Sequence, residues 1–343
     1  MKAVRLLKVG DLQVQDIPIP EIEDEEVLVQ VKVATICHTD VLIRSGDFPA
    51  NIPVTLGHEG AGVVAKMGSK VEGLSEGDRV AIGPIVGCGR CKLCMLGKEG
   101  FCEKGYEFMG GGFDCTFAEY IKMPERSLFR LPDMIPFDQG SALVDALVTP
   151  YGAMRTGEVK PGDSVAIFGL GGLGQCAVQC ARVFGAAKII AVDTVDKKLM
   201  LAKQVGADET INPTKMDPVE RIKELTNGLG VDVAFEIVGT EETADQAIAA
   251  LRCLGRAVII GIGIPKIEIE APDMFLSLGL SIRGHLGCDP TDFHPVIDLV
   301  AAGKIDLSRL VTHRVSFPDE VNKGVDILEK GEGNPVRIAI MME

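Results

Sequence analysis

The sequence predicts an α/β protein of two domains, one rich in antiparallel strands and one built on a doubly wound parallel sheet. The chain has 343 residues, which is too long for one small core and suits two domains. Up to about residue 130 the side chains alternate as in strands, and glycines and prolines interrupt them often. From about residue 148 strand-like runs alternate with helix-like runs, a pattern typical of a parallel sheet with helices on both faces.

The first domain is expected to be mainly antiparallel β structure. Four valines from Val27 to Val33 occupy every second position, which is the period of a strand with one buried face. Gly77-Asp78 predicts a turn that leads into a strand at residues 79–82. After about residue 287 the later alternation ends, so the tail is expected to return to this domain. The expected domains are residues 1–147 with 288–343, and residues 148–287.

The second domain is expected to contain parallel strands joined by helices. Its predicted strands are Ser164–Phe168, Ile189–Val192, Glu209–Ile211, Val231–Glu236 and Arg256–Ile260. Its clearest predicted helices are Gly172–Phe184 and Glu241–Arg252.

Composition narrows the class of partner. A formal net charge of −14 opposes binding to nucleic acids and anionic lipid surfaces, and no basic cluster offsets it. No apolar run reaches the roughly 18 residues needed to span a bilayer, and the N-terminus lacks the apolar core of a signal peptide. We therefore expect a cytoplasmic protein with neither a nucleic-acid nor a membrane partner.

A glycine-rich loop predicts a dinucleotide site. Gly169-Leu170-Gly171-Gly172-Leu173-Gly174 follows the strand ending at Phe168 and opens a helix, whose N-terminus attracts phosphate. The first glycine permits the turn, the second admits a pyrophosphate, and the third allows close packing. Asp193, nineteen residues after Gly174, can accept hydrogen bonds from the ribose hydroxyls of NAD. The alternatives are a simple tight turn and a solvated acid, and Lys197 and Lys198 leave NADP open on charge alone.

Four cysteines predict a closed metal site. They crowd into fifteen residues, at Cys88, Cys91, Cys94 and Cys102. Four thiolates can surround one tetrahedral zinc ion and leave no position for a substrate, so we expect a structural site. An iron–sulfur cluster and unligated cysteines are the alternatives. Interleaved glycines suit a loop that wraps a single ion, which favours zinc.

A second set of potential ligands is dispersed. Cys37 follows a predicted strand in Cys37-His38-Thr39-Asp40, and His58 lies beside Glu59 in a glycine-rich segment. A catalytic zinc needs three protein ligands and one open position. The residues alone leave the third ligand undecided among Glu59, Asp145 and the scattered cysteines.

These motifs together resemble the zinc-containing medium-chain alcohol dehydrogenases. The resemblance covers essentially the whole chain and rests on the segments at Cys37 and His58, the four cysteines, the Gly169–Gly174 loop and Asp193, in that order. It implies a GroES-like β-rich catalytic domain with a structural zinc lobe at about residues 84–105. It also implies a Rossmann domain and an active site in the cleft between the two.

The resemblance also implies ligands and nearby groups for a catalytic zinc. Cys37 and His58 are similar to two of the family's ligands, and the third falls at Asp145, where many members have Cys. Glu59 resembles the carboxylate that approaches zinc when water or product exchanges. Asp40 resembles the acid that orients the histidine ligand.

The implied chemistry is reversible hydride transfer between NAD and a primary or secondary alcohol, which gives an aldehyde or ketone. Zinc lowers the pKa of the alcohol, and Thr39 resembles the hydroxyl that bonds the substrate oxygen and takes its proton. The other implied cofactor contacts are Thr149 beside the nicotinamide, His38 and Arg337 at the pyrophosphate, and Leu173, Lys198, Val238, Gly261 and Gly263. Apolar candidates for the substrate pocket are Phe48, Phe108, Phe113, Phe117, Phe275 and Leu286, and the alternative for most of them is a place in the core.

The chain departs from some family members. Leu42 stands where relay-complete members have a histidine, three residues after Thr39. A long insertion found in dimeric relatives is absent, so we expect a homotetramer, with a dimer as the alternative. The two ligand groups predict two zinc ions per chain. Polyols, aromatic alcohols and cyclic hydroxyacyl-CoA compounds are alternative substrates. A non-catalytic NAD-binding relative should have lost Cys37, His58 or Thr39, and all three are present.

Overall fold

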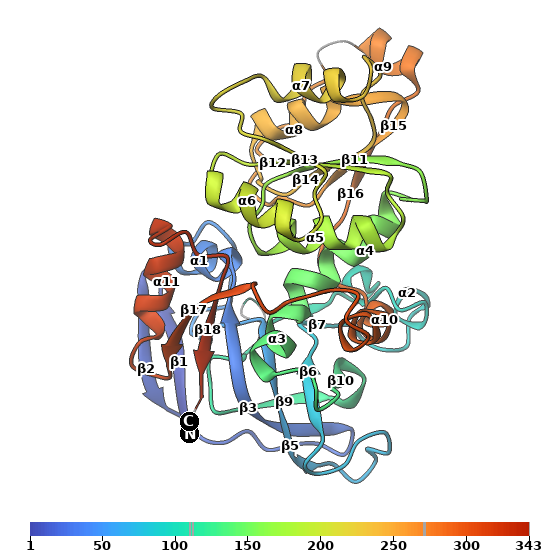
Figure 1. The fold of residues 1–343 in the computed structure, drawn as a ribbon. Helices are drawn as coiled ribbons and strands as arrows, with labels where there is room; N and C mark the ends of the chain where they lie inside the picture. The colour runs from blue at the N-terminus through green and yellow to red at the C-terminus, as the bar shows by residue number, and fades with distance from the viewer. Residues whose placement is uncertain (110, 112, 270–271, 343) are drawn as a thin grey trace. The chain divides into compact units, whose positions relative to one another are not determined.

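The computed structural model describes residues 1–109, 111, 113–269 and 272–342. Its chain divides into two compact units (Figure 1). The first comprises Met1–Val148 together with Gly287–Glu343, and the second comprises Thr149–Leu286.

A mostly antiparallel sheet organises the first unit around strand β3 (Glu26–Ile36). Its strands run in the order β10 (Leu128–Arg130), β6 (Arg79–Ile82), β5 (Glu59–Met67), β3, β18 (Arg337–Met341) and β17 (Val311–Ser316), and β9 (Tyr120–Pro124) also pairs with β3. The C-terminal β18 pairs antiparallel with β3, with Ile340 opposite Ala34. Gly62 permits the close approach of β5 to β3, because a Cβ there would lie 2.2 Å from the Gln30 carbonyl oxygen.

Smaller elements surround this sheet. The short strands are β1 (Lys2–Lys8), β2 (Asp11–Asp16), β4 (Val54–Thr55), β7 (Ile85–Val86) and β8 (Glu107–Phe108). The helices are α1 (His38–Ser45), α2 (Lys92–Met95), α3 (Phe137–Ala142), α10 (Pro290–Ala301) and α11 (Val321–Lys330), with short turns η1 (Glu99–Phe101), η2 (Glu125–Ser127) and η3 (Leu143–Leu147). Arg44 at the end of α1 ion-pairs with Asp326 at 2.6 Å and thereby joins α1 to α11.

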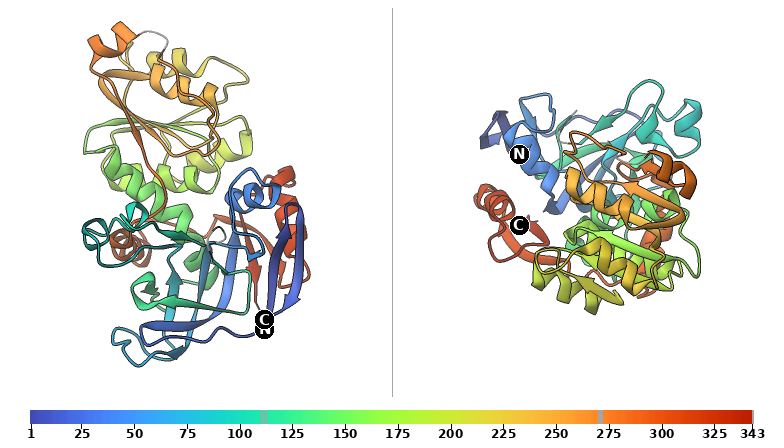
Figure 2. Two further views of the ribbon diagram at one scale, coloured as in Figure 1. Left: turned by 180° about the vertical axis from the view of Figure 1, so that it is seen from behind. Right: turned by 90° about the horizontal axis from the view of Figure 1, so that it is seen from above.

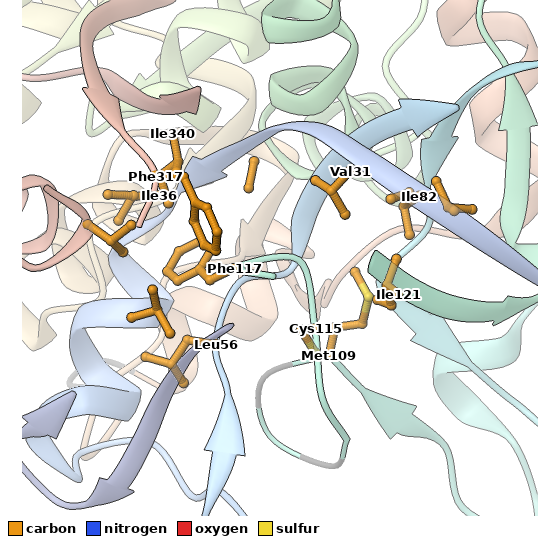
Figure 3. Close-up of a cluster of buried hydrophobic side chains, with 14 of the residues drawn as sticks. Val31, Ile36, Leu56, Ile82, Met109, Cys115, Phe117, Ile121, Phe317 and Ile340 are labelled. Carbon is orange, nitrogen blue, oxygen red and sulfur yellow. The ribbon is translucent and has the colours of Figure 1, made fainter. Parts of the chain in front are cut away.

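The core of the first unit draws on distant parts of the chain. Val31 and Ile36 of β3, Phe117 of a connecting segment and Ile340 of β18 are all at most 1% exposed (Figure 3). Removing this much apolar surface from water supplies the main stabilisation of the sheet. It also ties the C-terminal tail to the N-terminal sheet.

A parallel sheet forms the second unit. Its order is β13 (Glu209–Ile211), β12 (Lys188–Val192), β11 (Ser164–Phe168), β14 (Val231–Glu236), β15 (Leu251–Ile259) and β16 (Ser281–Gly284). All pairs are parallel. The strand order reverses between β11 and β14, which confirms the predicted doubly wound class.

Helices cover both faces of this sheet (Figures 1 and 2). Helices α4 (Val148–Thr156), α5 (Gly172–Val183) and α6 (Asp196–Gln204) lie on one face, and α7 (Pro218–Leu225) and α8 (Glu241–Ala249) lie on the other. A further helix, α9 (Pro272–Leu278), precedes β16. Among the described residues, no helix has the length and apolar character required to cross a membrane.

Two predicted boundaries, at the end of one helix and the start of the next strand, were wrong. Helix α8 ends at Ala249 rather than Arg252, and β15 begins at Leu251 rather than Arg256. Leu251 pairs with Val231 of β14, and the Val231 amide donates to the Ala250 carbonyl at 2.9 Å. This strand pairing overrides the helical pattern of the preceding residues.

Candidate metal centres and cofactor site

The first unit brings Cys37, His58, Glu59 and Asp145 together. One potential ligand atom from each lies within 4.8 Å of the others. Cys37 follows β3 and precedes α1, His58 and Glu59 stand at the start of β5, and Asp145 belongs to η3, a single π-helical turn. Such turns occur often at functional sites because they redirect side chains. The Cys37 Sγ lies 3.5 Å from Asp145 Oδ2.

Local backbone geometry fixes this arrangement. Gly57 has φ +95°, and a Cβ there would lie 2.3 Å from the ring of Phe117, so only glycine fits the turn before His58. The pairing of β3 with β5 then places Thr35 opposite Glu59. The segments holding the potential ligands are thereby fixed next to one another.

Asp40 orients both His58 and the backbone at Cys37. The His58 ring, 2% exposed, faces the fully buried Asp40 carboxylate with Nδ1 and Oδ1 3.2 Å apart. The Cys37 amide donates to the other Asp40 oxygen at 2.9 Å. An Nδ1–H donated to the carboxylate leaves the His58 Nε2 lone pair for a metal. Burial alone would lower the pKa of His58, but the Asp40 charge and hydrogen bond outweigh it and raise that pKa well above its usual value.

Arg337 reaches this group from β18. The residue is 3% exposed, and its guanidinium donates to Glu59 Oε1 at 3.1 Å and to Asp145 Oδ2 at 3.3 Å. Thr35 donates its hydroxyl to the other oxygen of Glu59. Burial raises the pKa of Glu59 to about 7, with Arg337 opposing and Asp145 reinforcing the rise.

Sequence reasoning missed these contacts of Arg337 and Thr35. Neither residue lies in a motif that signals them, because strand pairing across the sheet creates both contacts. The role of Arg337 at the pyrophosphate stays a prediction.

The remaining predicted groups of the first unit lie at the start of α1. The Thr39 hydroxyl is 3.9 Å from Cys37 Sγ, and Leu42, three residues later on α1, is half-buried. His38 is exposed. In the part of the chain that the structure describes, the cysteines outside the two clusters do not join the group at Cys37. This narrows the remaining ligand candidates to Glu59 and Asp145.

Aromatic side chains adjoin His58. The Phe108 ring is 5.3 Å from the His58 ring, and the Phe48 ring is 6.1 Å from that of Phe108. Phe117 is fully buried and belongs to the core. Among the pocket candidates, Phe108 contacts His58 through its ring, and Phe48 contacts Phe108.

The four cysteines of the second group also converge. The sulfur of Cys91 lies 3.4 Å from that of Cys94 and 3.9 Å from that of Cys102, and Cys88 lies 4.0 Å from Cys94. Ligands at about 2.3 Å around a tetrahedral zinc ion stand roughly 3.8 Å apart, so these spacings fit one ion. All four thiols are free of disulfides.

Backbone amides prepare the cluster for negative charge. The Cys88 amide donates to Cys102 Sγ, and the Cys91 amide donates to Cys88 Sγ, both at 3.4 Å. Hydrogen bonds from backbone amides, first that of Arg90, lower the pKa of the Cys88 thiol to about 6. Thiolates are the form that binds metal.

An ion pair that sequence reasoning missed, between the buried Glu99 and the exposed Arg126, supports this lobe. Glu99 is 4% exposed and accepts from the Gly87 amide at 2.6 Å. Arg126 donates to the Gly87 carbonyl at 2.5 Å and lies 3.4 Å from Glu99. The pair fixes the backbone immediately before Cys88.

The glycine-rich loop of the second unit has the predicted form. Gly169 has φ +94°, and a Cβ on Gly174 would lie only 1.9 Å from the Gly169 carbonyl oxygen. A Cβ on Gly171 would meet nothing within 4 Å, which leaves open space at the N-terminus of α5. This space and the helix N-terminus suit a phosphate.

Asp193 supports the same loop. Its carboxylate accepts from the Leu170 amide and from the Val195 amide, each at 2.8 Å. The other predicted contacts of this unit are Leu173 on α5, Lys198 on α6, Val238 after β14, Gly261 and Gly263 after β15, and Thr149 on α4, which is 2% exposed. Asp193 thus has a structural role that the sequence did not reveal, in addition to the predicted contact with ribose.

Comparisons with known proteins agree with this geometry. Residues 23–133 match the alcohol dehydrogenase GroES-like domain, and residues 172–302 match the zinc-binding dehydrogenase model. An NAD-dependent alcohol dehydrogenase of Sulfurisphaera tokodaii is 33% identical over 96% of each chain. A probable D-xylulose reductase A of Aspergillus fumigatus is 37% identical over 91% of this chain and 89% of its own.

A solved structure shows the same fold. A putative zinc-binding dehydrogenase of Sinorhizobium meliloti 1021, bound to NADP, matches with a TM-score of 0.90 and 34% identity, covering 99% of this chain and 98% of its own. Fold and ligand groups together define a zinc-binding dehydrogenase. The chain belongs to the zinc-containing medium-chain alcohol dehydrogenase family, which confirms the resemblance.

Proposed function

We propose that the protein is an NAD-dependent alcohol dehydrogenase that interconverts a primary or secondary alcohol with its aldehyde or ketone. The convergence of Cys37, His58, Glu59 and Asp145 within 4.8 Å carries this proposal. A thiolate, an imidazole and carboxylates together suit zinc. Zinc bound there supplies a Lewis acid that makes a substrate hydroxyl more acidic.

The chain's own residues would handle the proton and the geometry. Oxidation removes a hydride from the alcohol carbon and a proton from its oxygen, and we assign Thr39 Oγ1 as the first proton acceptor. Asp40 holds the His58 ring by the contact between Nδ1 and Oδ1 at 3.2 Å. Arg337 balances the charge of Glu59 and Asp145, so that the carboxylates can be buried together.

We assign NAD as the cofactor because Asp193 stands at the end of β12 and would repel a 2′-phosphate. The S. tokodaii relative is named as NAD-dependent, whereas the S. meliloti structure holds NADP. Parallel assays with the two cofactors test the assignment. A higher kcat/KM with NADP would contradict it.

A polyol is the second candidate substrate, and the similarity to a D-xylulose reductase favours it. A panel of ethanol, cyclohexanol, benzyl alcohol and xylitol, followed by NADH absorbance, separates simple alcohols from polyols. A cyclic hydroxyacyl-CoA belongs in the same panel. Activity on none of these, with both metals loaded, would favour the non-catalytic alternative.

We further propose a homotetramer. Strand β16 is an edge strand of its sheet, and edges of this kind can pair with another copy. Exposed apolar side chains belong to the elements next to it: Met274 and Leu276 lie on α9, which precedes β16 in the sequence, and Leu254 lies on β15, which pairs with β16. All three residues are at least 59% exposed. Light scattering coupled to size exclusion measures the assembly, and a monomer or a dimer would contradict the homotetramer.

A further inference from the structure

Glu236 occupies the point where the strand order of the parallel sheet reverses. It is the last residue of β14 and pairs in register with Phe168, the last residue of β11. The glycine-rich loop begins at Gly169, immediately after Phe168. In open parallel sheets, ligands bind outside the carboxyl ends of the strands at such a reversal.

The carboxylate of Glu236 organises the loop that follows it. Its Oε1 accepts from the Val238 amide at 2.7 Å, the Gly239 amide at 2.8 Å and the Thr243 hydroxyl at 2.8 Å. Three donors on one oxygen fix both the turn and the first residues of α8. The Glu236 side chain is 0% exposed, so water does not compete for these bonds.

The same residue also holds the segment after β15. Its backbone carbonyl accepts from the Ile260 amide at 2.9 Å and from the Gly261 amide at 3.1 Å. A Cβ on Gly261 would lie 2.5 Å from Glu236 Oε2 and 2.2 Å from the Gly239 amide nitrogen. Glycine at 261 is therefore the residue that lets the two loops meet over this carboxylate.

The glycine-rich loop touches this assembly from the other side. A Cβ on Gly169 would lie 2.7 Å from Val238 Cγ2 and 3.3 Å from the Val238 amide nitrogen. Three loops of the proposed dinucleotide site thus meet around Glu236. A change in the Val238 turn would press on Gly169 directly.

The second carboxylate oxygen of Glu236, Oε2, is buried and has no hydrogen-bond partner among the described residues. A buried polar atom left in this way costs free energy. An acid retained at that cost, at the strand-order reversal, indicates a role beyond filling space.

We propose that Glu236 is a positioning residue for the dinucleotide. Its carboxylate holds the Val238 turn and the Gly261 segment against Gly169, and this preforms the surface on which the cofactor lies. The inference rests on the proposed NAD-dependent function. Glu236 acts through Val238, Gly239 and Thr243 and is not assigned a contact with the reacting atoms.

The test compares Glu236→Gln with Glu242→Gln in the zinc-loaded protein. Both variants replace a carboxylate with an amide, but Glu242 lies exposed on α8, where it accepts a hydrogen bond from Gln246 at 3.1 Å. In Glu236→Gln an amide oxygen replaces Oε1 and is a weaker acceptor than a carboxylate oxygen, and an NH2 group replaces Oε2 in the crowded space beside Gly261. NADH fluorescence should show a Kd raised about tenfold or more in Glu236→Gln and unchanged in Glu242→Gln, because hydrogen bonds to a buried charge are strong.

Steady-state kinetics separates positioning from general damage. Glu236→Gln should raise KM for NAD while KM for the alcohol at saturating NAD stays close to wild type. If the Kd for NADH and the KM for NAD are unchanged, or if the alcohol KM rises equally, the positioning role is wrong. Thr243→Val removes one donor without touching the carboxylate and should raise the Kd about two- to threefold.

If Glu236→Gln does not fold, Thr243→Val provides the test. An unchanged Kd for NADH in Thr243→Val overturns the inference. Failure of the proposed function has a different signature. It would appear as a wild-type protein that binds neither NADH nor NADPH.

Discussion

Arg337 and Glu59 form a buried ion pair although 278 residues separate them, with Nη2 and Oε1 3.0 Å apart and side chains 4% and 0% exposed. Strand β18 carries the arginine beside β3, and β5 carries the acid on the other side of β3. The ion pair thus connects the two sequence segments of the first unit, residues 1–148 and 287–343, at the candidate catalytic metal site. Loss of Arg337 would leave the buried Glu59 without its countercharge, which is strongly destabilising, whereas loss of Glu59 leaves Arg337 paired with Asp145.

The buried acid predicts a pH dependence of stability. The pKa of Glu59 is raised from 4.5 to about 7 in the folded protein, mainly by burial. A raised folded pKa contributes stability that is present below the unfolded pKa and lost as the pH rises through about 7. Metal-stripped wild type should therefore lose on the order of 2 kcal/mol relative to Glu59→Gln between about pH 5 and 8. Urea unfolding at each pH measures the difference, and parallel curves for the two proteins would contradict it.

Asp145→Ala should lose one metal and keep the other. Asp145 is one of the group at Cys37, whereas the four-cysteine cluster is independent of it. Elemental analysis should fall from two zinc ions per chain to one, and kcat should fall at least about 100-fold because the Lewis acid is lost. Asp133→Ala, at a side chain that is 97% exposed, is the control. Two retained zinc ions with full activity would falsify Asp145 as a ligand.

Cys91→Ser should affect stability more than chemistry. Cys91 contacts Cys94 and Cys102 through sulfur, and a structural site couples metal binding to folding. We expect a lower Tm and one fewer zinc ion, with kcat close to wild type at a temperature where the variant is folded. Cys253→Ser, at the exposed cysteine, should change neither. A variant with wild-type Tm and full zinc would count against the structural site.

Asp193→Ser should narrow the preference for NAD over NADP. The substitution removes the charge that repels a 2′-phosphate, but it also removes the acceptor for the Leu170 and Val195 amides. We therefore expect weaker binding of both cofactors and a smaller ratio between them. The ratio of kcat/KM values measures this, and an unchanged ratio would show that Asp193 serves the loop alone.

Leu42→His tests how the proton leaves. Leu42 lies on α1, one turn after Thr39, and its side chain has neither donor nor acceptor. If proton release limits the rate, histidine there should raise kcat for oxidation, most of all at low pH. Added imidazole buffer should partly replace it in the wild type. If neither change affects kcat between roughly pH 6 and 9, hydride transfer or cofactor release sets the rate instead.

Contiguous motifs carried most of what the sequence could predict. The Cys88–Cys102 cluster and the Gly169–Gly174 loop are local, so spacing alone indicated their geometry. Asp145 was different, because only the family resemblance distinguished it from the scattered cysteines. Its place beside Cys37 depends on the π-helical turn η3.

Contacts made by strand pairing were beyond prediction. The pairing of β18 with β3 creates the Arg337–Glu59 contact, and no local pattern encodes a register between such distant strands. The end of α8 was misplaced for the same reason, since the pairing of Leu251 with Val231 decided it. Glu236 carried no motif signal, because its three bonds appear only after the turn at Val238 has folded.

Zinc content measured together with NADH formation shows whether alcohol oxidation depends on a zinc ion at the group containing Cys37. Protein stripped of metal and reloaded should bind two zinc ions per chain, one at the group containing Cys37 and one at the four-cysteine cluster. Alcohol-dependent NADH formation should return only when zinc occupies the group containing Cys37. One zinc or fewer per chain after full loading, or full activity without zinc at the Cys37 group, would contradict the account.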